Sequence, residues 1–286
     1  MATSSSFNPL RRLQGDIVGQ VRAVFNDRAR GERPVVRSAN ALFPRDSVIW
    51  RVHGDVTTMM VGGMAALLLQ MLHPAALTAV LDHSNFRSDM LGRLRRTAKF
   101  IALTTYGDRA EAEAAIARVR AIHDRVTGTL ADGTPYRAGD PHLLAWVHTA
   151  EALCFLDAWI AYGEPAMTLP AQDRYFAEAA VVARALGADP VPQTRHEALA
   201  FVREVRPELR ATPDCLEVAQ LIITPQTSNI GGAVMHRLLA RAAIDLLPPW
   251  TRDLLKLGRA GPEALVTHSA TRGVAATLRW AFSGQR

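Results

Sequence analysis

The chain has 286 residues, 49% of them hydrophobic and 21% charged, so it can bury a large core and is not a disordered protein. Its formal net charge is +6, but the basic residues are scattered among 27 acids without a basic run, which argues against a nucleic-acid partner. The two cysteines, Cys154 and Cys215, form no disulfide or metal-binding pattern, and the polar N-terminus lacks a signal-peptide core. We therefore expect a cytoplasmic protein.

Residues 1–45 are expected to contain one helix, over residues 10–25, and a connecting loop. Residues 46–286 are expected to form a single domain. After a short helix over residues 48–53 comes a stretch of 26 residues, 56–81, without Asp, Glu, Lys or Arg. Such a stretch is either a membrane span or the buried centre of a soluble fold.

Three residues near the middle of this charge-free stretch, Gln70, His73 and Pro74, argue against a membrane span, as does the absence of basic residues at its two ends. We expect a buried helix pair that is kinked near Pro74. One face of this pair is expected to pack on the helices that carry Arg93 and His123. Gly62 and Gly63 are small enough to allow close approach of another helix or of a flat ligand.

The middle of the chain is predicted to be two helices followed by a hairpin. Residues 88–106 form a helix stopped by Gly107, and Asp108 caps a helix over residues 108–126 that Gly128 terminates. Asp132-Gly133 is a hairpin turn signal within residues 127–140, and Asp140-Pro141 begins a long helix to residue 162. Further helices are expected over residues 171–186, 194–205, 214–223, 233–246, 250–257 and 262–281. The predicted fold is thus all-α, a single multi-helix domain with one short β-hairpin-like excursion.

The helix over residues 108–126 carries a histidine in the middle of its apolar stripe. The stripe consists of Ala112, Ile116, Val119, His123 and Val126. A histidine buried there needs a partner for its ring nitrogens. That partner is either a carbonyl or side chain of the protein or a metal, for which neutral imidazole is a common ligand. Arg120, one turn earlier, lies at the edge of the stripe.

The preceding helix has a polar pair beside its buried face. That face is expected to consist of Met90, Leu91, Leu94, Ala98 and Ile101. Arg93 and Thr97 are four residues apart and project together along its flank. They can hold an anion, a carboxylate or an oxygen species. Alternatively, Arg93 covers apolar surface and Thr97 bonds back to its own helix.

Two other histidines, His73 and His83, flank the second half of the charge-free stretch. Their spacing fits no standard metal site, so helix capping and loop bonding are the favoured roles. The sequence contains no Ser-His-Asp, P-loop, G-x-G-x-x-G or H-E-x-x-H signature. The pattern of repeated Glu-x-x-His that a di-iron carboxylate bundle requires is also missing.

A series of short motifs nevertheless occurs in a specific order. The series is Leu69-Gln70-x-x-His73-Pro74, Asp82-His83-Ser84-x-Phe86, Arg93-x-x-x-Thr97, Arg120-x-x-His123-x-x-x-x-Gly128 and Asp132-Gly133-x-x-Tyr136-x-Ala138-x-Asp140-Pro141. This series, densest between residues 50 and 146, resembles the MpaB-type oxygenase family, which includes the latex clearing proteins, the bacterial rubber oxygenases.

The resemblance implies an all-α protein that binds b-type haem and uses O2 to cleave isoprenoid double bonds. It implies that His123 is the proximal ligand of the haem iron and that Arg120 helps to orient the haem or this histidine. Arg93 and Thr97 would be the catalytic pair beside the haem. Three residues of the charge-free stretch complete the expected cofactor-binding set, namely Gly62, Gly63 and His73.

Two departures from the rubber-cleaving branch bear on the substrate. That branch has a lysine directly before the threonine, where this chain has Arg96, and a guanidinium that stays protonated is a poor iron ligand. The rubber enzymes also use a glutamate on the preceding segment as proton acceptor, whereas residues 56–81 contain no acid. Rubber itself is therefore a disfavoured substrate.

The sequence thus predicts a haem b-dependent oxygenase or oxidase that acts with O2 on a small apolar substrate, such as an isoprenoid or a secondary metabolite. We expect an electron donor as a further partner, and a location in the cytoplasm or at the periphery of a membrane. The alternative is a non-catalytic helical protein that binds haem or a lipid.

Overall fold

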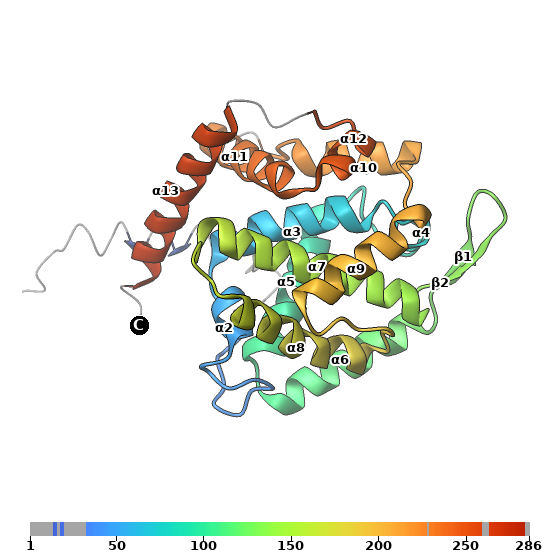
Figure 1. Ribbon diagram of the computed structural model, residues 1–286, viewed down its shortest axis with the longest axis horizontal. Coiled ribbons are helices and arrows are strands. Elements are labelled where there is room, and N and C mark those ends of the chain that lie inside the picture. Colours follow the sequence, from blue (N-terminus) through green and yellow to red (C-terminus); the bar gives the residue numbers. More distant parts are fainter. Residues whose placement is uncertain (1–13, 16–17, 20–32, 228, 259–262, 284–286) are drawn as a thin grey trace, which may run out of the picture.

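The computed structural model describes residues 14–15, 18–19, 33–227, 229–258 and 263–283. The helices within these ranges are α2 (Val48–Val52), α3 (Val56–Gln70), α4 (Pro74–His83), α5 (Met90–Tyr106), α6 (Arg109–His123), α7 (Pro141–Tyr162), α8 (Leu169–Leu186), α9 (Arg195–Val205), the 3-10 helix η2 (Arg206–Glu208), α10 (Pro213–Ile223), α11 (Ile230–Leu246), α12 (Pro249–Leu254) and α13 (Glu263–Ser283). Strands β1 (Thr127–Thr129) and β2 (Pro135–Arg137) form an antiparallel hairpin that projects from one end of the molecule (Figure 1).

The all-α class and the hairpin excursion are therefore confirmed. The helix expected over residues 10–25 lies mostly outside the described residues. The division of the chain at residue 45 stays a prediction.

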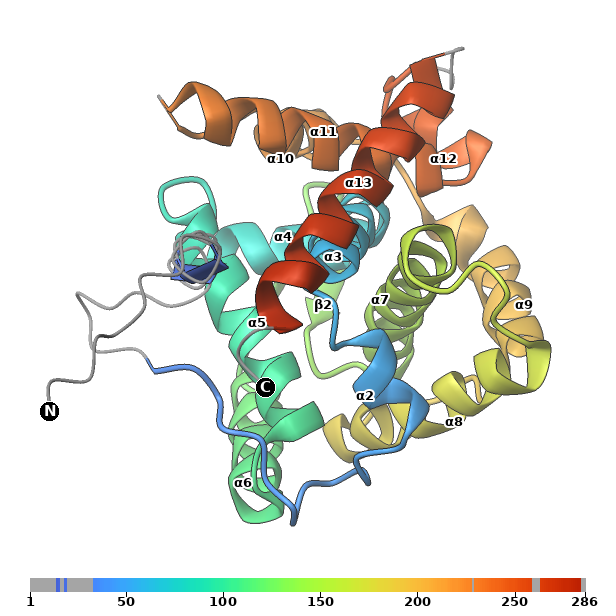
Figure 2. The same ribbon diagram turned by 90° about the vertical axis from the view of Figure 1, so that its left-hand side faces the viewer.

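Two apolar helices, α3 and α7, pack against each other at the centre of the core. Helices α11 and α13 also pack on α3, and Figure 2 shows α13 crossing over it. The expectation that α3 packs on the helices of Arg93 and His123 is wrong, since its main partner is α7. Small residues at the contact, Gly62, Ala65 and Ala66, allow this close approach and are themselves largely buried.

The charge-free stretch breaks where the proline predicts it. Helix α3 ends at Gln70, and Pro74 occupies the first turn of α4, where its missing N–H is tolerated. The axes of α3 and α4 meet at 106°. This bent pair and α7 have the length and composition of membrane spans, but 72% of the apolar window of α7 is buried inside the protein.

Two predictions near His123 need correction. Asp108 caps α6 as expected by accepting from the amide of Ala110, but the helix ends at His123 instead of at residue 126. Gly128 does not terminate the helix, because it already lies in β1, opposite Tyr136 of β2. A third expectation, that Leu91 is buried, is also wrong, because Leu91 is 47% exposed. Helix α3 packs on α7 and leaves this part of α5 uncovered.

A buried carboxylate fastens the C-terminal helix to the centre of the fold. Asp55 caps α3 by accepting from the amide of Thr58, and Nη1 of Arg279 on α13 lies 2.8 Å from its other carboxylate oxygen. Nη2 of Arg279 donates to the carbonyl of Tyr162 at 3.0 Å. The start of α3, the end of α7 and α13 are thereby held together.

Candidate functional site

Helices α5 and α6 form a hairpin that places Arg93 near His123. Asp89 caps the start of α5 by accepting from the amide of Gly92, and Gly107 ends this helix. Asp108 then starts α6 after a two-residue connection. The first turn of α5 therefore lies alongside the last turn of α6, and the positive charge of Arg93 acts on the imidazole of His123.

His123 is the last residue of α6 and is half-buried. Its Nδ1 is buried and has no hydrogen-bond partner among the described residues. Burial lowers the pKa of His123, and the nearby Arg93 lowers it further. A buried polar atom without a partner is costly and calls for an explanation. A neutral imidazole with a free nitrogen is the form in which histidine binds metals.

Arg93 is also half-buried, and its guanidinium has no hydrogen-bond or ion-pair partner within the described ranges. Burial lowers its pKa, and the neighbouring Arg96 adds to this effect. A guanidinium that lacks a carboxylate partner and is partly removed from water is suited to bind an anionic ligand group. Thr97, one turn along the same flank, is exposed. The structure thus brings Arg93 and His123 together, with Thr97 on the adjacent turn of α5.

Arg120 has a less central position than the sequence suggested. Its side chain is exposed and lies beside Gly187, at the C-terminal end of α8. Its role in orienting a cofactor or His123 stays a prediction.

The motif residues around the hairpin fix the chain that follows His123. The hydroxyl of Tyr136 donates to Asp82 Oδ2 at 3.1 Å, and Nε2 of His83 lies 3.2 Å from the carbonyl of Thr127. A Cβ at Gly128 would lie 2.5 Å from the Tyr136 hydroxyl, so only glycine fits under this ring. The expected loop-bonding role of His83 is confirmed. Residues of three of the motifs, Asp82-His83, Gly128 and Tyr136, therefore lie in one contact region between α4 and the hairpin.

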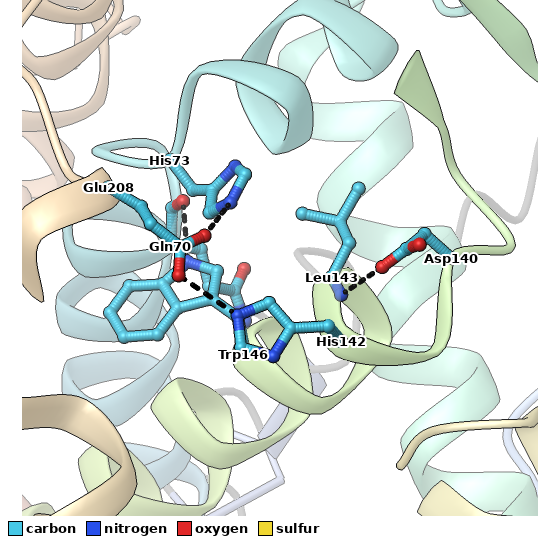
Figure 3. Close-up of polar contacts among 7 residues, drawn as sticks. All are labelled: Gln70, His73, Asp140, His142, Leu143, Trp146 and Glu208. Atoms are coloured by element: carbon cyan, nitrogen blue, oxygen red, sulfur yellow. Dashed lines mark hydrogen bonds and ion pairs between the residues drawn. The ribbon is translucent and has the colours of Figure 1, made fainter. Parts of the chain in front are cut away.

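His73 takes part in a different cluster, at the bend between α3 and α4 (Figure 3). Its Nε2 lies 3.3 Å from one carboxylate oxygen of Glu208, and Nε2 of His142 lies 3.1 Å from the other. Below this pair, the indole of Trp146 donates to the carbonyl of Gln70 at 3.2 Å. Burial lowers the pKa of His73, while Glu208 opposes this shift. Glu208 of η2 thus links His73, at the start of α4, to His142 on α7. The predicted part of His73 in cofactor binding stays a prediction.

Gly62 and Gly63 face α7 in this structure. A Cβ at Gly62 would lie 2.9 Å from the carbonyl oxygen of Cys154 and 2.9 Å from Cα of Phe155. A Cβ at Gly63 would lie at an ordinary 3.7 Å from the Phe155 ring. Of the two alternatives for these glycines, close approach of a helix explains Gly62. A cofactor contact at either glycine stays a prediction.

A second polar region, which the sequence interpretation missed, lies between α2, α5, α7 and α8. A cavity of about 70 Å³ is lined there by Glu151 and His148 of α7, together with His53 and Tyr175. One signal was present in the sequence, because Glu151 is the only Asp, Glu, Lys or Arg between Asp140 and Asp157. An isolated charge in an apolar helix is a reason to expect a function.

Among the described residues there is no group of three or more His, Cys, Asp or Glu side chains placed to hold a metal ion.

The comparison with known families defines the class of protein. A family model described as "ER-bound oxygenase mpaB/B'/Rubber oxygenase, catalytic domain" matches residues 50–280. The match makes the chain an oxidoreductase of the oxygenase type. The chain belongs to the MpaB and rubber oxygenase family, and the resemblance inferred from the motif series is confirmed. Neither a search of curated proteins nor a search of solved structures gave a significant match.

Proposed function

We propose that this oxygenase-family protein is a haem b-dependent oxygenase or oxidase that acts with O2 on a small apolar substrate. The observation that carries the proposal is the buried Nδ1 of His123, which has no partner among the described residues and lies on a neutral imidazole near the unpaired Arg93. In this arrangement an imidazole nitrogen of His123 is available to bind an iron ion, and the guanidinium of Arg93 is available to bind a carboxylate.

The residues at the α5–α6 hairpin fit the chemical groups of a haem. The imidazole of His123 would hold the iron, and the guanidinium of Arg93 would bind a propionate. Leu91 at the start of α5 and Ile122 at the end of α6 are 47% and 45% exposed, which leaves apolar surface for a flat ring. Bound haem would supply an iron centre that activates O2. The cavity beside Glu151, at about 70 Å³, is too small for a haem and does not include Arg93 or His123, so the haem is placed at the hairpin and not in this cavity.

The protein side chains would then have separate tasks. His123 stays neutral because burial and Arg93 both disfavour its protonated form. Arg93 fixes the orientation of an anionic group, and the Thr97 hydroxyl offers a hydrogen bond on the same flank. The apolar walls of α5 and α7 favour a substrate without charge.

We further propose a cytoplasmic protein, or one peripheral to a membrane, with an electron donor as partner and without a nucleic-acid partner. The burial of the apolar helices α3 and α7 in the core supports this.

The test is the haem content per chain of protein produced with an ample haem supply. We expect one haem per chain in the natural protein and a strong loss in His123→Ala. His83→Gln is the matched control, because His83 lies in the same region but bonds to the Thr127 carbonyl. A natural protein without haem would overturn haem as the proposed cofactor. The same haem content in His123→Ala as in the natural protein would overturn His123 as the proposed iron ligand.

A further inference from the structure

The cavity between α2, α5, α7 and α8 combines apolar walls with a small set of polar side chains. Its polar lining consists of His53, Thr104, Thr105, His148, Glu151 and Tyr175. A volume of about 70 Å³ is several times what one water requires, and buried waters need two to four polar partners. The cavity is therefore suited to hold a small number of water molecules.

Glu151 is the acid of this cavity. Its carboxylate has no hydrogen bond or ion pair with any residue that the structure describes, although Glu151 is half-buried and lines the cavity. Asp157, six residues later on α7, is instead paired with Arg195 at 2.5 Å. Burial raises the pKa of Glu151 to about 7, so both protonation states are accessible near neutral pH.

The histidine one turn before Glu151 can accept a hydrogen bond. Nε2 of His148 lies 3.1 Å from the carbonyl of Ala179, to which it can only donate, so in the neutral ring Nδ1 is left as an acceptor. Burial lowers the pKa of His148 to about 4, which keeps the ring neutral. Glu151 and His148 thus offer the cavity one group that exchanges a proton and one that accepts a hydrogen bond.

The remaining polar groups are already engaged with each other. The Thr105 hydroxyl donates to the carbonyl of Ile101 at 2.7 Å, so it accepts from Nδ1 of His53 at 2.9 Å. Nε2 of His53 then accepts from the Tyr175 hydroxyl at 3.0 Å. In this series of hydrogen bonds each proton already has an acceptor. Glu151 is therefore the group in the cavity that remains able to change its protonation state.

Helix α5 connects the cavity to the Arg93–His123 pair. Arg93, Thr97, Ile101 and Thr104 are spaced by three or four residues and share one face of α5. Ile101 and Thr104 line the cavity, whereas Arg93 lies beside His123. At 1.5 Å per residue, Thr104 lies about 10 Å along the helix axis from Thr97 and about 17 Å from Arg93, so a proton path between the cavity and the pair needs a chain of several waters.

We propose that Glu151 is a proton-exchanging group that serves the oxygenase site through water held in this cavity. In each exchange an O–H bond of a cavity water breaks while an O–H bond forms on the carboxylate of Glu151, and that water takes a proton in turn from the next water or from the oxygenase site. The reverse sequence returns the proton, and no oxidation state changes. The inference rests on the proposed function for its role in the reaction, but its test does not require haem.

Several titratable groups surround Glu151, and the test has to distinguish Glu151 from them. They are His148 and Cys154 on α7, His53 directly after α2, Tyr106 on α5, and Tyr175 and Glu178 on α8. Burial raises the pKa values of the two tyrosines and of the cysteine and lowers those of the two histidines. Glu178, which bonds to the amide of Ile49, is the matched control acid.

The experiment is infrared spectroscopy of the full chain as a function of pH, with the protonated carboxyl band as the signal. We expect a band that titrates near pH 7 and is lost in Glu151→Gln but kept in Glu178→Gln. In D2O this band should shift within the mixing time, because cavity water reaches the carboxyl group. Glu151→Asp, which keeps a carboxyl group in the cavity, should retain a titrating band.

Two results would overturn the inference. One is ionisation of Glu151 at the usual pH of an exposed glutamate, and the other is a protonated band that does not exchange in D2O. A protein that binds no haem but shows the expected band would contradict the proposed function and leave the proton-exchanging carboxyl group intact. The two failures are therefore distinguishable.

Discussion

The guanidinium of Arg93 on α5 and the imidazole of His123 on α6 lie close enough for the charge of Arg93 to lower the pKa of His123. Burial is the larger cause of this shift, and both effects favour the neutral ring. The two residues are 30 positions apart in the sequence, and the two-residue connection between α5 and α6 brings them together. The proposed haem site depends mainly on this pair.

Arg93→Gln should raise the pKa of His123 towards its ordinary value of 6.5, because a nearby positive charge is removed. The shift is measurable by NMR titration of the imidazole ring in protein without haem. Arg118→Gln is the control, since Arg118 is exposed on α6 and is not a cause of the shift at His123. An unchanged His123 titration in Arg93→Gln would mean that the two side chains do not interact.

The raised pKa of Glu151 makes stability depend on pH. Below about pH 4.5 the carboxyl group is neutral in both the folded and the unfolded chain. Between pH 4.5 and about 7 only the unfolded chain ionises, so the free energy of unfolding falls as the pH rises. Above about pH 7 the free energy of unfolding stays lower by a constant amount of about 3 kcal/mol.

Glu151→Gln should remove this loss, so its stability relative to the natural protein should increase by up to about 3 kcal/mol between pH 5 and pH 8. Chemical denaturation at several pH values measures the difference. The lowered pKa values of His53 and His148 destabilise both proteins at acid pH, so this contribution cancels in the comparison. A difference that does not vary with pH would contradict the assignment.

Neighbouring glycines on α3 should respond in opposite ways to alanine. In Gly62→Ala the new Cβ meets backbone atoms of α7 at 2.9 Å, so we expect a loss of about 1–3 kcal/mol. In Gly63→Ala the nearest atom lies at 3.7 Å, and the better helix propensity should stabilise the protein by about 0.5–1 kcal/mol. Urea denaturation of the two variants gives both values, and equal effects would refute the close contact at Gly62.

Tyr136→Phe should loosen the chain that follows His123. The substitution removes the hydrogen bond to Asp82, with an expected loss of about 1 kcal/mol. It should also change the NMR signals of His123. Tyr106→Phe removes a comparable bond to the carbonyl of Trp50 and should leave those signals in place. If both variants behave alike at His123, the hairpin does not position this residue.

The helix pattern could be predicted because it depends on local signals. Asp108, Asp140 and Pro74 mark helix starts in the sequence, and each does so in the structure. The early end of α6 at His123 was missed, because apolar periodicity continues through Val126 although the chain already turns into β1. A pattern of apolar residues indicates burial but does not by itself show where the backbone leaves the helix.

Packing partners were harder to predict than helices. The charge-free stretch had to be buried, yet nothing in its composition distinguishes α7 from α5 as its partner. The pair of Arg93 and His123 could be found, since each belongs to a short motif on a recognisable helix. The cavity of Glu151 could not, because His53, Glu151 and Tyr175 come from three separate segments of the chain that meet only after folding.

The most direct test of His123 as the iron ligand is the absorption spectrum of His123→Gly protein, recorded with and without added imidazole. If His123 is the protein ligand of a haem iron, the Soret band of the natural protein should be lost or strongly shifted in the variant. Free imidazole should then restore it by filling the space left by the side chain. A spectrum that is identical in the natural protein and in His123→Gly, and unaffected by imidazole, would contradict the claim.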